Sequence, residues 1–332
     1  MSKLNENKGL TLKHISVLSN TNITTVYKYA VKNSLVSIPS SSSRGAKYSP
    51  KEIRKITTHY FANKNPAREN NKRIAGFHFK GGTGKSSINT ELSVLLALLG
   101  YKVLLVDADQ QGHASHILGF NTSDKLSTLY DCFKNNFSIE DVIINVFEGM
   151  DVIPANLSLS NIESVLRENS DKDSMNALAN LMKPIEEKYD YIIFDTAPSI
   201  TDLNRNIFYY VDDFQLICDT QPASVQSLSQ IEDYLREFRD RHLKQPPNLF
   251  IIPNKYEDRA SSSVETISFL QKSWKNNMIS DFAVRKSEDI PRAFLEQTPL
   301  SFFCKVNSIA FEDISIIARH LVSRTNKVQE EK

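Results

Sequence analysis

The sequence contains few cysteines and no long hydrophobic run. Cys132, Cys218 and Cys304 lie far apart, form no CxxC pair and are odd in number, which argues against a disulfide framework or a zinc ribbon. We interpret them as buried thiols in a reducing cytosol. The longest apolar stretches, such as 94–99, are far too short to span a bilayer, and no apolar run follows Lys3. The sequence therefore favours a protein that is neither exported nor embedded in a membrane.

Neither low complexity nor internal repetition is found along the chain, apart from a serine run at 40–43. Of its 332 residues, 40% are hydrophobic and 24% are charged, which is ordinary for a protein that buries a core. A chain of this length usually holds one large α/β domain and a smaller one. We therefore expect two domains and little disorder.

Charge is unevenly distributed, although the net charge is only +1. Residues 1–73 contain 14 Lys and Arg against 3 Asp and Glu, a balance of +11, whereas residues 74–332 contain 26 against 36, a balance of −10. Binding to a polyanion is driven by phosphate neutralisation and counterion release. The basic first part therefore indicates contact with nucleic acid, with a solvated charged face as the alternative.

The basic part has the pattern of two short consecutive helices. Apolar residues at helical spacing predict a helix over 11–20, and a second helix over 23–33 opens with threonines suited to an N-cap. This is a helix–turn–helix pattern, in which the second helix enters the major groove of DNA. The side chains expected to contact bases and phosphates are Thr24, Thr25, Tyr27, Lys28 and Lys32.

A serine-rich segment, 40–46, follows the second helix and is expected to form a wing. A third helix is expected from Ser49 to about Phe61, with Pro50 in its first turn. This order resembles the MerR-like winged helix–turn–helix. We place this small α-helical domain at residues 1–65, followed by a polar linker at 66–72.

From Arg73 onward, apolar strand candidates alternate with helical segments. This pattern predicts a doubly wound, mostly parallel sheet covered by helices on both faces, an α/β domain over 73–325. Strands are expected near 74–79, 103–106, 152–153, 191–194, 214–219 and 249–253. Helices are expected at 85–99, 162–169, 174–188, 223–241, 262–276 and 308–324.

A glycine-rich segment, KGGTGKSS at 80–87, lies between the first of these strands and the first of these helices. This is the context that a P-loop requires. Glycines let consecutive backbone N–H groups point at phosphate oxygens, and the helix N-terminus adds its positive dipole. Lys85 is expected to reach the β and γ phosphates, and Ser86 to ligate Mg²⁺. The nucleotide-binding residues of this P-loop NTPase are expected to be Gly81, Gly82, Thr83, Gly84, Lys85, Ser86 and Ser87.

Carboxylates end two of the expected strands. Asp107 and Asp109 follow Lys85 by 22 and 24 residues, a spacing of one helix and one crossover. This spacing puts both carboxylates at the end of the adjacent strand, beside the γ phosphate. Helix capping or solvation is the alternative for such a pair. Asp195 ends the apolar run 191–194 and supplies oxygen ligands of the kind that suit Mg²⁺.

With Lys80 at its start, KGGTGKS resembles the deviant Walker A motif of the ParA, MinD and nitrogenase iron protein group, and the resemblance extends over 73–320. It implies an ATP-dependent sandwich homodimer in which Lys80 reaches the phosphates of the partner subunit, as an arginine finger does elsewhere. The alternative is a lysine that only solvates the loop edge. The segment DADQQG at 107–112 resembles the Walker A′ motif, usually DxDPQG, with Gln110 in place of the proline.

The same resemblance assigns roles to single residues. It implies that Asp109 orients or activates the attacking water, that Asp107 helps to hold the magnesium water shell, and that Asp195 binds Mg²⁺ through water. Asn254, in a segment that resembles the adenine-facing part of the family, is the expected base contact. The expected catalytic residues are Lys80, Lys85 and Asp109, and the expected metal ligands are Ser86, Asp107 and Asp195.

We therefore expect a slow ATP hydrolase with ATP and Mg²⁺ as cofactors that drives plasmid or chromosome partition. The resemblance implies a homodimer that binds DNA, a ParB-type centromere-binding partner that stimulates hydrolysis, and repression of the chain's own operon. It also implies a cytoplasmic, nucleoid-associated protein. Further nonspecific contacts to DNA are expected from Arg285, Lys286 and Arg292.

Other functions are open at this point. A nucleotide-responsive transcriptional regulator is one alternative, against which the retained Asp109 argues. A MinD-like positioning ATPase is another, but such chains end in a basic amphipathic helix, whereas 325–332 is polar. A nitrogenase-type reductase needs two cysteines near the nucleotide, and those of this chain lie in other motifs. His113 and His116 lack further ligands at zinc spacing and are interpreted as solvated or core residues.

Overall fold

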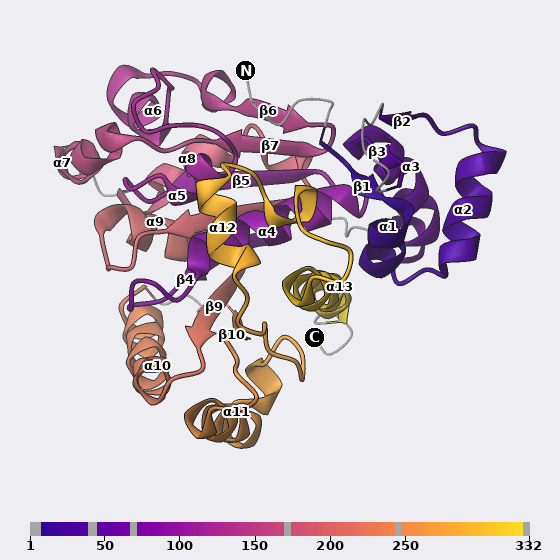
Figure 1. The fold of residues 1–332 in the computed structure, drawn as a ribbon. Helices are drawn as coiled ribbons and strands as arrows, with labels where there is room; N and C mark the ends of the chain where they lie inside the picture. The colour runs from indigo at the N-terminus through magenta and orange to yellow at the C-terminus, as the bar shows by residue number, and fades with distance from the viewer. Residues whose placement is uncertain (1–7, 39–44, 67–71, 169–173, 243–247, 328–332) are drawn as a thin grey trace.

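The structure is a computed structural model that describes residues 8–38, 45–66, 72–168, 174–242 and 248–327. Most of the expected wing, most of the expected linker and the end of the chain lie outside these residues. The basic N-terminal segment forms three helices beside a small antiparallel sheet with strand order β1-β3-β2 (Figure 1). Its elements are β1 (Leu10–Thr11), α1 (Leu12–Ser19), α2 (Ile23–Lys32), β2 (Ser37–Ile38), β3 (Lys47–Tyr48) and α3 (Pro50–Tyr60).

Side-chain caps fix the starts of these helices. The Thr11 hydroxyl accepts a hydrogen bond from the backbone N–H of His14, and Ser49 caps α3 with Pro50 in the first turn. The N-cap of α2 is Asn22, whose Oδ1 accepts from the N–H of Thr24 at 2.8 Å, and not a threonine as expected. Asn is among the strongest N-cap residues, because its short side chain satisfies an N–H that has no partner in the helix.

The rest of the chain forms the expected α/β fold. Within the described residues, seven strands form one sheet with the order β10-β9-β4-β8-β5-β7-β6, parallel except for the edge strand β6. Every residue of β5 and β8 is buried, as in a parallel sheet that helices cover on both faces. The strands are β4 (Lys72–Phe77), β5 (Val103–Ala108), β6 (Ile144–Phe147), β7 (Met150–Ile153), β8 (Tyr191–Thr196), β9 (Asp213–Asp219) and β10 (Asn248–Asn254).

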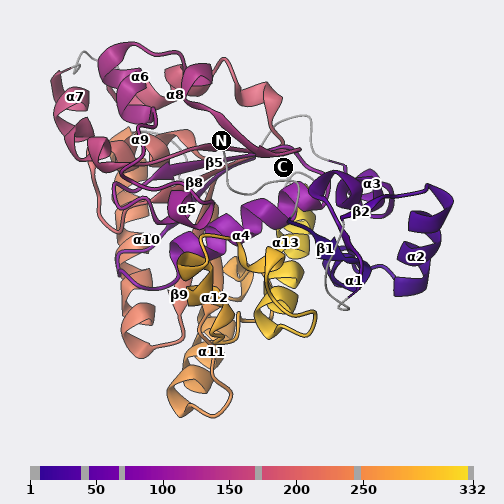
Figure 2. The ribbon, with the colours of Figure 1, turned by 45° about the horizontal axis from the view of Figure 1, so that its top comes forward.

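The buried apolar side chains form two clusters, one on each face of the sheet, and each cluster contains a different set of helices. Figure 1 shows α12 in front of α4 on one face, and Figure 2 shows α4, α12 and α13 together on that side. This face carries α4 (Lys85–Leu98), α5 (His113–Ile117), α12 (Asp289–Leu295) and α13 (Ile309–Lys327). The second cluster includes α6 (Leu129–Asn135), α7 (Ile162–Glu168), α8 (Ala177–Met182), α9 (Asp202–Tyr210), α10 (Pro222–His242) and α11 (Ser261–Ser273).

The helix expected over 174–188 is instead three short pieces. A 3-10 turn at Ser174–Asn176 leads into α8, and a second turn follows at Glu186–Lys188. Pro184 explains the break, because proline has no N–H to donate and its ring clashes with the preceding helical turn.

The N-terminal segment is docked on the α/β domain at the far end of α4 from the glycine-rich loop (Figures 1 and 2). Arg54 of α3 donates hydrogen bonds to the carbonyl of Ala97 in the last turn of α4 and to those of Gly100 (3.0 Å) and Tyr101 (2.7 Å) just beyond it. The last carbonyls of a helix have no partner within the helix and gain from a cation. Arg54 therefore serves as a C-cap supplied by the N-terminal segment.

A second arginine fixes the docking from the opposite direction. Arg319 of α13 donates to the carbonyls of Val17 (2.7 Å) and Leu18 (2.9 Å) at the end of α1. Buried side chains of α1 and α3 also belong to the same hydrophobic cluster as α4 and α13. The two parts of the chain therefore share one continuous core.

Replacing Arg54 with alanine is expected to lower the free energy of unfolding by about 2–3 kcal/mol, because hydrogen bonds to a charged group contribute ~1.5–3 kcal/mol. The measurement is urea denaturation followed by circular dichroism, with the midpoint as readout. Lys55→Ala is the matched control, since that exposed lysine on the same helix pairs with its neighbour Glu52 on α3. Equal midpoints for both variants would contradict the capping role.

Candidate functional site

The glycine-rich loop lies between β4 and α4, at the carboxyl edge of the sheet. Gly82 and Gly84 have φ angles of +76° and +88°, a region that side chains other than glycine rarely adopt. At Gly84 a Cβ would also lie 2.5 Å from the amide nitrogen of Asn254. The loop therefore needs glycine at this position for both its turn and its packing.

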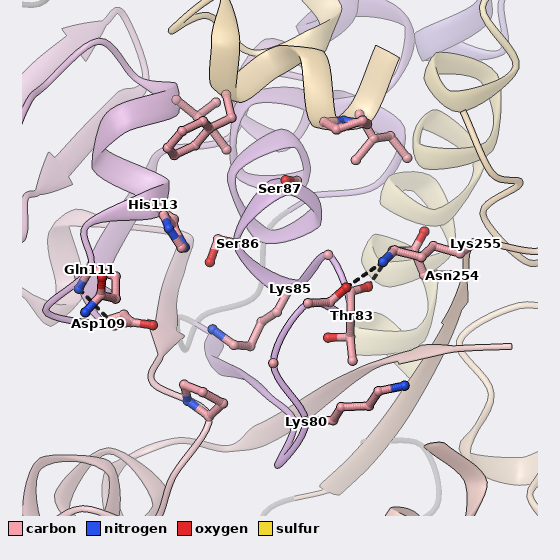
Figure 3. A pocket seen from close by; sticks show the side chains of 18 of the residues that line it. Lys80, Thr83, Lys85, Ser86, Ser87, Asp109, Gln111, His113, Asn254 and Lys255 are labelled. Carbon is pink, nitrogen blue, oxygen red and sulfur yellow. Dashed lines mark hydrogen bonds between the residues drawn. The ribbon is translucent and has the colours of Figure 1, made fainter. Parts of the chain in front are cut away.

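A cavity of about 900 Å³ opens beside this loop. It brings together Lys80 and the expected nucleotide-binding residues Gly81 to Ser87 with Asp109 and Asn254, from three distant parts of the chain (Figure 3). This volume lies in the range of small-molecule and cofactor sites. Further lining residues are Gln110, Gln111, His113, Ile117, Ala197, Pro198, Ser199, Lys255, Lys286, Ser287, Glu288, Ile290, Pro291 and Phe294.

Lys85, the first residue of α4, is buried and paired with Asp195 at 3.1 Å between Nζ and Oδ1. It also donates to the carbonyl of Thr196. Asn89, one turn further along α4, donates to the same oxygen of Asp195 at 2.9 Å and accepts from Gln215 at 3.0 Å. Asn89 and Gln215 were missed by the sequence analysis, because no local pattern links residues so far apart in the chain.

Asp107 and Asp195 are direct neighbours on the adjacent strands β5 and β8. Both are fully buried. Burial, and then the charge of Asp195, raise the pKa of Asp107 to about 7, although Ser115 donates to it through both N–H and hydroxyl. Asp195 Oδ2 is buried and has no hydrogen-bond partner among the described residues. Carboxylate and hydroxyl oxygens suit a hard divalent cation such as Mg²⁺. Ser86 lines the cavity, whereas Asp107 and Asp195 are not among its lining residues.

Asp109 lies at the rim of the cavity just beyond β5. Its Oδ1 accepts from the N–H of Gln111 at 3.0 Å, and its own N–H donates to Asp107 at 3.2 Å. Figure 3 shows the amine of Lys85 pointing towards the side of the cavity on which Asp109 lies. Asp109 is therefore held by Gln111 of its own loop and by Asp107 of β5.

The side chain of Lys80 points away from that of Lys85. Its Nζ lies 3.0 Å from Asp219 Oδ2 and 3.5 Å from the hydroxyl of Ser224, which itself donates to Asp219. In Figure 3 the amines of Lys80 and Lys85 point to opposite sides of the loop. The N–H of Lys80 donates to Nδ1 of His78 at 3.0 Å, and burial lowers the pKa of this histidine, so the neutral ring can accept.

Asn254 has a structural role in the loop. Its amide donates to the carbonyl of Thr83 at 2.7 Å, while its Oδ1 is buried and finds no partner in the described part of the chain. The next residue, Lys255, donates to the carbonyl of Gly82 at 2.5 Å. These two residues hold the loop from the β10 side, and the contact of Asn254 with a base stays a prediction.

The expected DNA contacts fall into two groups. On α2, Thr24, Tyr27, Lys28 and Lys32 are exposed and Thr25 is half-buried. In the α/β domain, each expected cation is already paired with a carboxylate. The pairs are Arg285 with Asp313 (2.6 Å), Lys286 with Glu257 (3.0 Å) and Arg292 with Glu296 (2.9 Å). Binding of phosphates by these three side chains stays a prediction and would require breaking these pairs.

His113 and His116 pack around Phe294 of α12, with ring centroids at 5.4 and 4.2 Å. Across the part of the chain that the structure describes, no group of three or more His, Cys, Asp or Glu is placed to hold a metal ion. In the same residues, no helix has both the length and the apolar character to cross a membrane.

Comparison with known proteins identifies the family of this chain. Residues 71–275, more than half of the chain, match the family model AAA_31, described as AAA domain. The cell division protein PomZ of Myxococcus xanthus is 28% identical over 288 residues, which cover 86% of this chain and 88% of PomZ. The sporulation initiation inhibitor protein Soj of Bacillus subtilis is 32% identical over 166 residues, 50% of this chain and 65% of Soj.

Among solved structures, a plasmid partition protein of Borrelia burgdorferi bound to AMPPNP has a TM-score of 0.62. It is 24% identical and covers 77% of this chain and 100% of its own, a likeness that shows the fold. The mostly parallel sheet and the loop beside buried carboxylates define an α/β P-loop NTPase. The family match then places the chain: it belongs to the AAA_31 family, as a P-loop ATPase of the ParA and Soj type.

Proposed function

We propose that the chain is a Mg²⁺-dependent ATP hydrolase of the partition or positioning type that acts on DNA as an ATP-dependent sandwich homodimer. The observation that carries this proposal is the pair of lysines in one loop. Both lysines line the cavity, but their amines point to opposite sides of the loop, where Lys85 is paired with Asp195 and Lys80 with Asp219. A lysine on the outer side of a phosphate-binding loop is suited to the phosphates of a second copy.

The residues of this site then have separate tasks. Backbone N–H groups of the loop and Lys85 bind the phosphates, and phosphate oxygens replace Asp195 as the partner of Lys85. Ser86, Asp107 and Asp195 would hold Mg²⁺, which would neutralise charge on the phosphates. Asp109 orients the attacking water, and Lys80 leaves Asp219 to stabilise charge on the phosphates of the partner subunit.

The N-terminal segment supplies the DNA-binding part of the proposal. Its three helices, the antiparallel strands β2 and β3 and its basic charge are compatible with a winged helix–turn–helix that enters the major groove through α2. Repression of the chain's own operon, a ParB-type partner that stimulates hydrolysis, and a nucleoid-associated location in the cytoplasm rest on the resemblance of the motifs.

The test measures the molecular mass of the protein in solution and its rate of ATP turnover. Light scattering after gel filtration is expected to show a doubled mass with ATP and Mg²⁺ but not with ADP, together with slow ATP turnover that DNA and the partner accelerate. Lys80→Ala is expected to bind ATP normally but to lose about 10³-fold or more in turnover, the lower range for a charge supplied in trans. Lys102→Ala is the control, because that side chain is exposed and does not line the cavity.

A wild-type chain that stays monomeric with ATP, or a Lys80→Ala variant with full turnover, would contradict the sandwich dimer. DNA binding that responds to ATP without any hydrolysis would instead favour a nucleotide-responsive transcriptional regulator.

A further inference from the structure

The N-terminal segment has a long stretch without negative charge. Residues 7–51 contain seven Lys and Arg and no Asp or Glu. Both α1 and α2 lie within this stretch. No acidic side chain of the same helix therefore neutralises Lys28 or Lys32, whereas the cations of α12 and of the segment before it are paired. The surface of α2 is suited to a negatively charged partner.

The outer face of α2 is also apolar. Ile23, Tyr27 and Val31 are spaced by four residues and form one stripe, with 43%, 59% and 61% of each residue's surface exposed. Val36, just beyond the helix, is 73% exposed. These four are a third of the twelve large apolar residues that the described part of the chain leaves exposed. Val26 and Ala30 already fill the core on the inner face of α2.

DNA is a partner that matches both the positive charge and the apolar stripe of this face. The major groove of DNA is bordered by phosphates and presents a single apolar group, the C5-methyl of thymine. A second copy of this chain would bring the same uncompensated lysines against each other. The combination of lysines and an apolar stripe on one helix therefore favours DNA over self-association.

We propose that α2 reads thymine methyl groups, with Tyr27 and Val31 in contact with the methyls and Lys28 and Lys32 on the flanking phosphates. This inference rests on the proposed DNA-binding function and specifies which bases the segment selects. The bound sequences are expected to carry A·T pairs opposite the middle of α2.

The experiment uses the full chain with ATP and Mg²⁺. Duplexes are selected from a random-sequence library, and the protected thymines of the enriched sequence are then replaced by deoxyuridine, which lacks only the methyl group. The affinity for DNA is expected to fall about fourfold for each methyl group in contact. This loss corresponds to the ~0.8 kcal/mol of transfer free energy gained when one CH₂ group is buried. A mixed-sequence duplex without the enriched site shows how much binding is nonspecific.

A double-mutant cycle, which combines a substitution on α2 with the change from thymine to deoxyuridine, tests whether α2 makes the methyl contact. Val31→Ser and Tyr27→Ser are expected to weaken binding to thymine DNA and to remove the difference between thymine and deoxyuridine. Val264→Ser is the matched control, because Val264 is an exposed valine on α11 and its variant should keep the full difference. ATP turnover without DNA reports that each variant is folded.

The outcomes separate this inference from the function on which it rests. Selective binding that is equal for thymine and deoxyuridine overturns methyl reading and leaves DNA binding intact. Failure to enrich any sequence removes the DNA-binding function of this segment, and the inference with it. A loss of dimer mass in Val31→Ser without DNA, together with methyl-independent binding, would assign the stripe to self-association and overturn the inference.

Discussion

Replacing Lys85 with alanine is expected to weaken ATP binding by ~10²–10³-fold and to abolish measurable turnover, because the variant loses charge-assisted hydrogen bonds of ~1.5–3 kcal/mol each. Lys85 is the buried cation of the cavity, and its pairing with Asp195 holds it in place before nucleotide arrives. Isothermal titration with a non-hydrolysable ATP analogue measures the affinity directly.

The control for this variant is Lys80→Ala, which removes a lysine from the same loop but from its other side. Its affinity for nucleotide is expected to stay within a few-fold of the wild type. Because Lys85→Ala leaves Asp195 without its counter-charge, circular dichroism must show that the variant is folded. A folded Lys85→Ala protein with normal affinity would remove the P-loop assignment.

Replacing Asp109 with alanine is expected to separate binding from hydrolysis. Turnover should fall by ~10²–10⁴-fold, the range for loss of a positioned general base, while the affinity for ATP changes little. The reason lies in its contacts: Asp109 bonds to its own loop at Gln111 and Asp107 and not to Lys85. Single-turnover kinetics and gel filtration with ATP measure the two properties on one sample.

The Asp109→Asn variant distinguishes a chemical role of the carboxylate from a structural one. Asparagine keeps an oxygen that can accept the hydrogen bond from the N–H of Gln111 but has no negative charge. If the carboxylate acts on water, the asparagine variant is as slow as the alanine variant and still forms the ATP dimer. Recovery of turnover in Asp109→Asn would reduce Asp109 to a loop-positioning residue, and full activity of Asp109→Ala would exclude both roles.

The sequence predicted those parts of the molecule that local pattern determines. The strands of the parallel sheet are buried on both faces and appear as apolar runs, and the loop from Lys80 to Ser87 carries its chemistry in consecutive residues. The edge strand β6 and the short helix α12 were missed, because four and seven residues carry too little periodicity. Pro184 was visible in the sequence and should have ended the helix expected there.

Contacts between residues that are distant in the chain could not be predicted from the sequence. The pairing of Lys80 with Asp219 and the support of Asp195 by Asn89 depend on which strands become neighbours. The same holds for Arg285, which looks like a free surface cation in the sequence and lies against Asp313 in the structure. Composition and spacing indicate which charges a segment has, whereas packing decides which of them remain available.

The cap that Arg54 places on α4 has a consequence for anyone who divides this chain. A fragment that begins at residue 66 would uncover both the carbonyls of Ala97 and Tyr101 and the apolar side of α13, and such surfaces promote aggregation. Chimeras in which the first 65 residues are exchanged would need a donor segment that brings its own equivalent of Arg54 and accepts Arg319. Point substitutions are therefore the safer way to study either half.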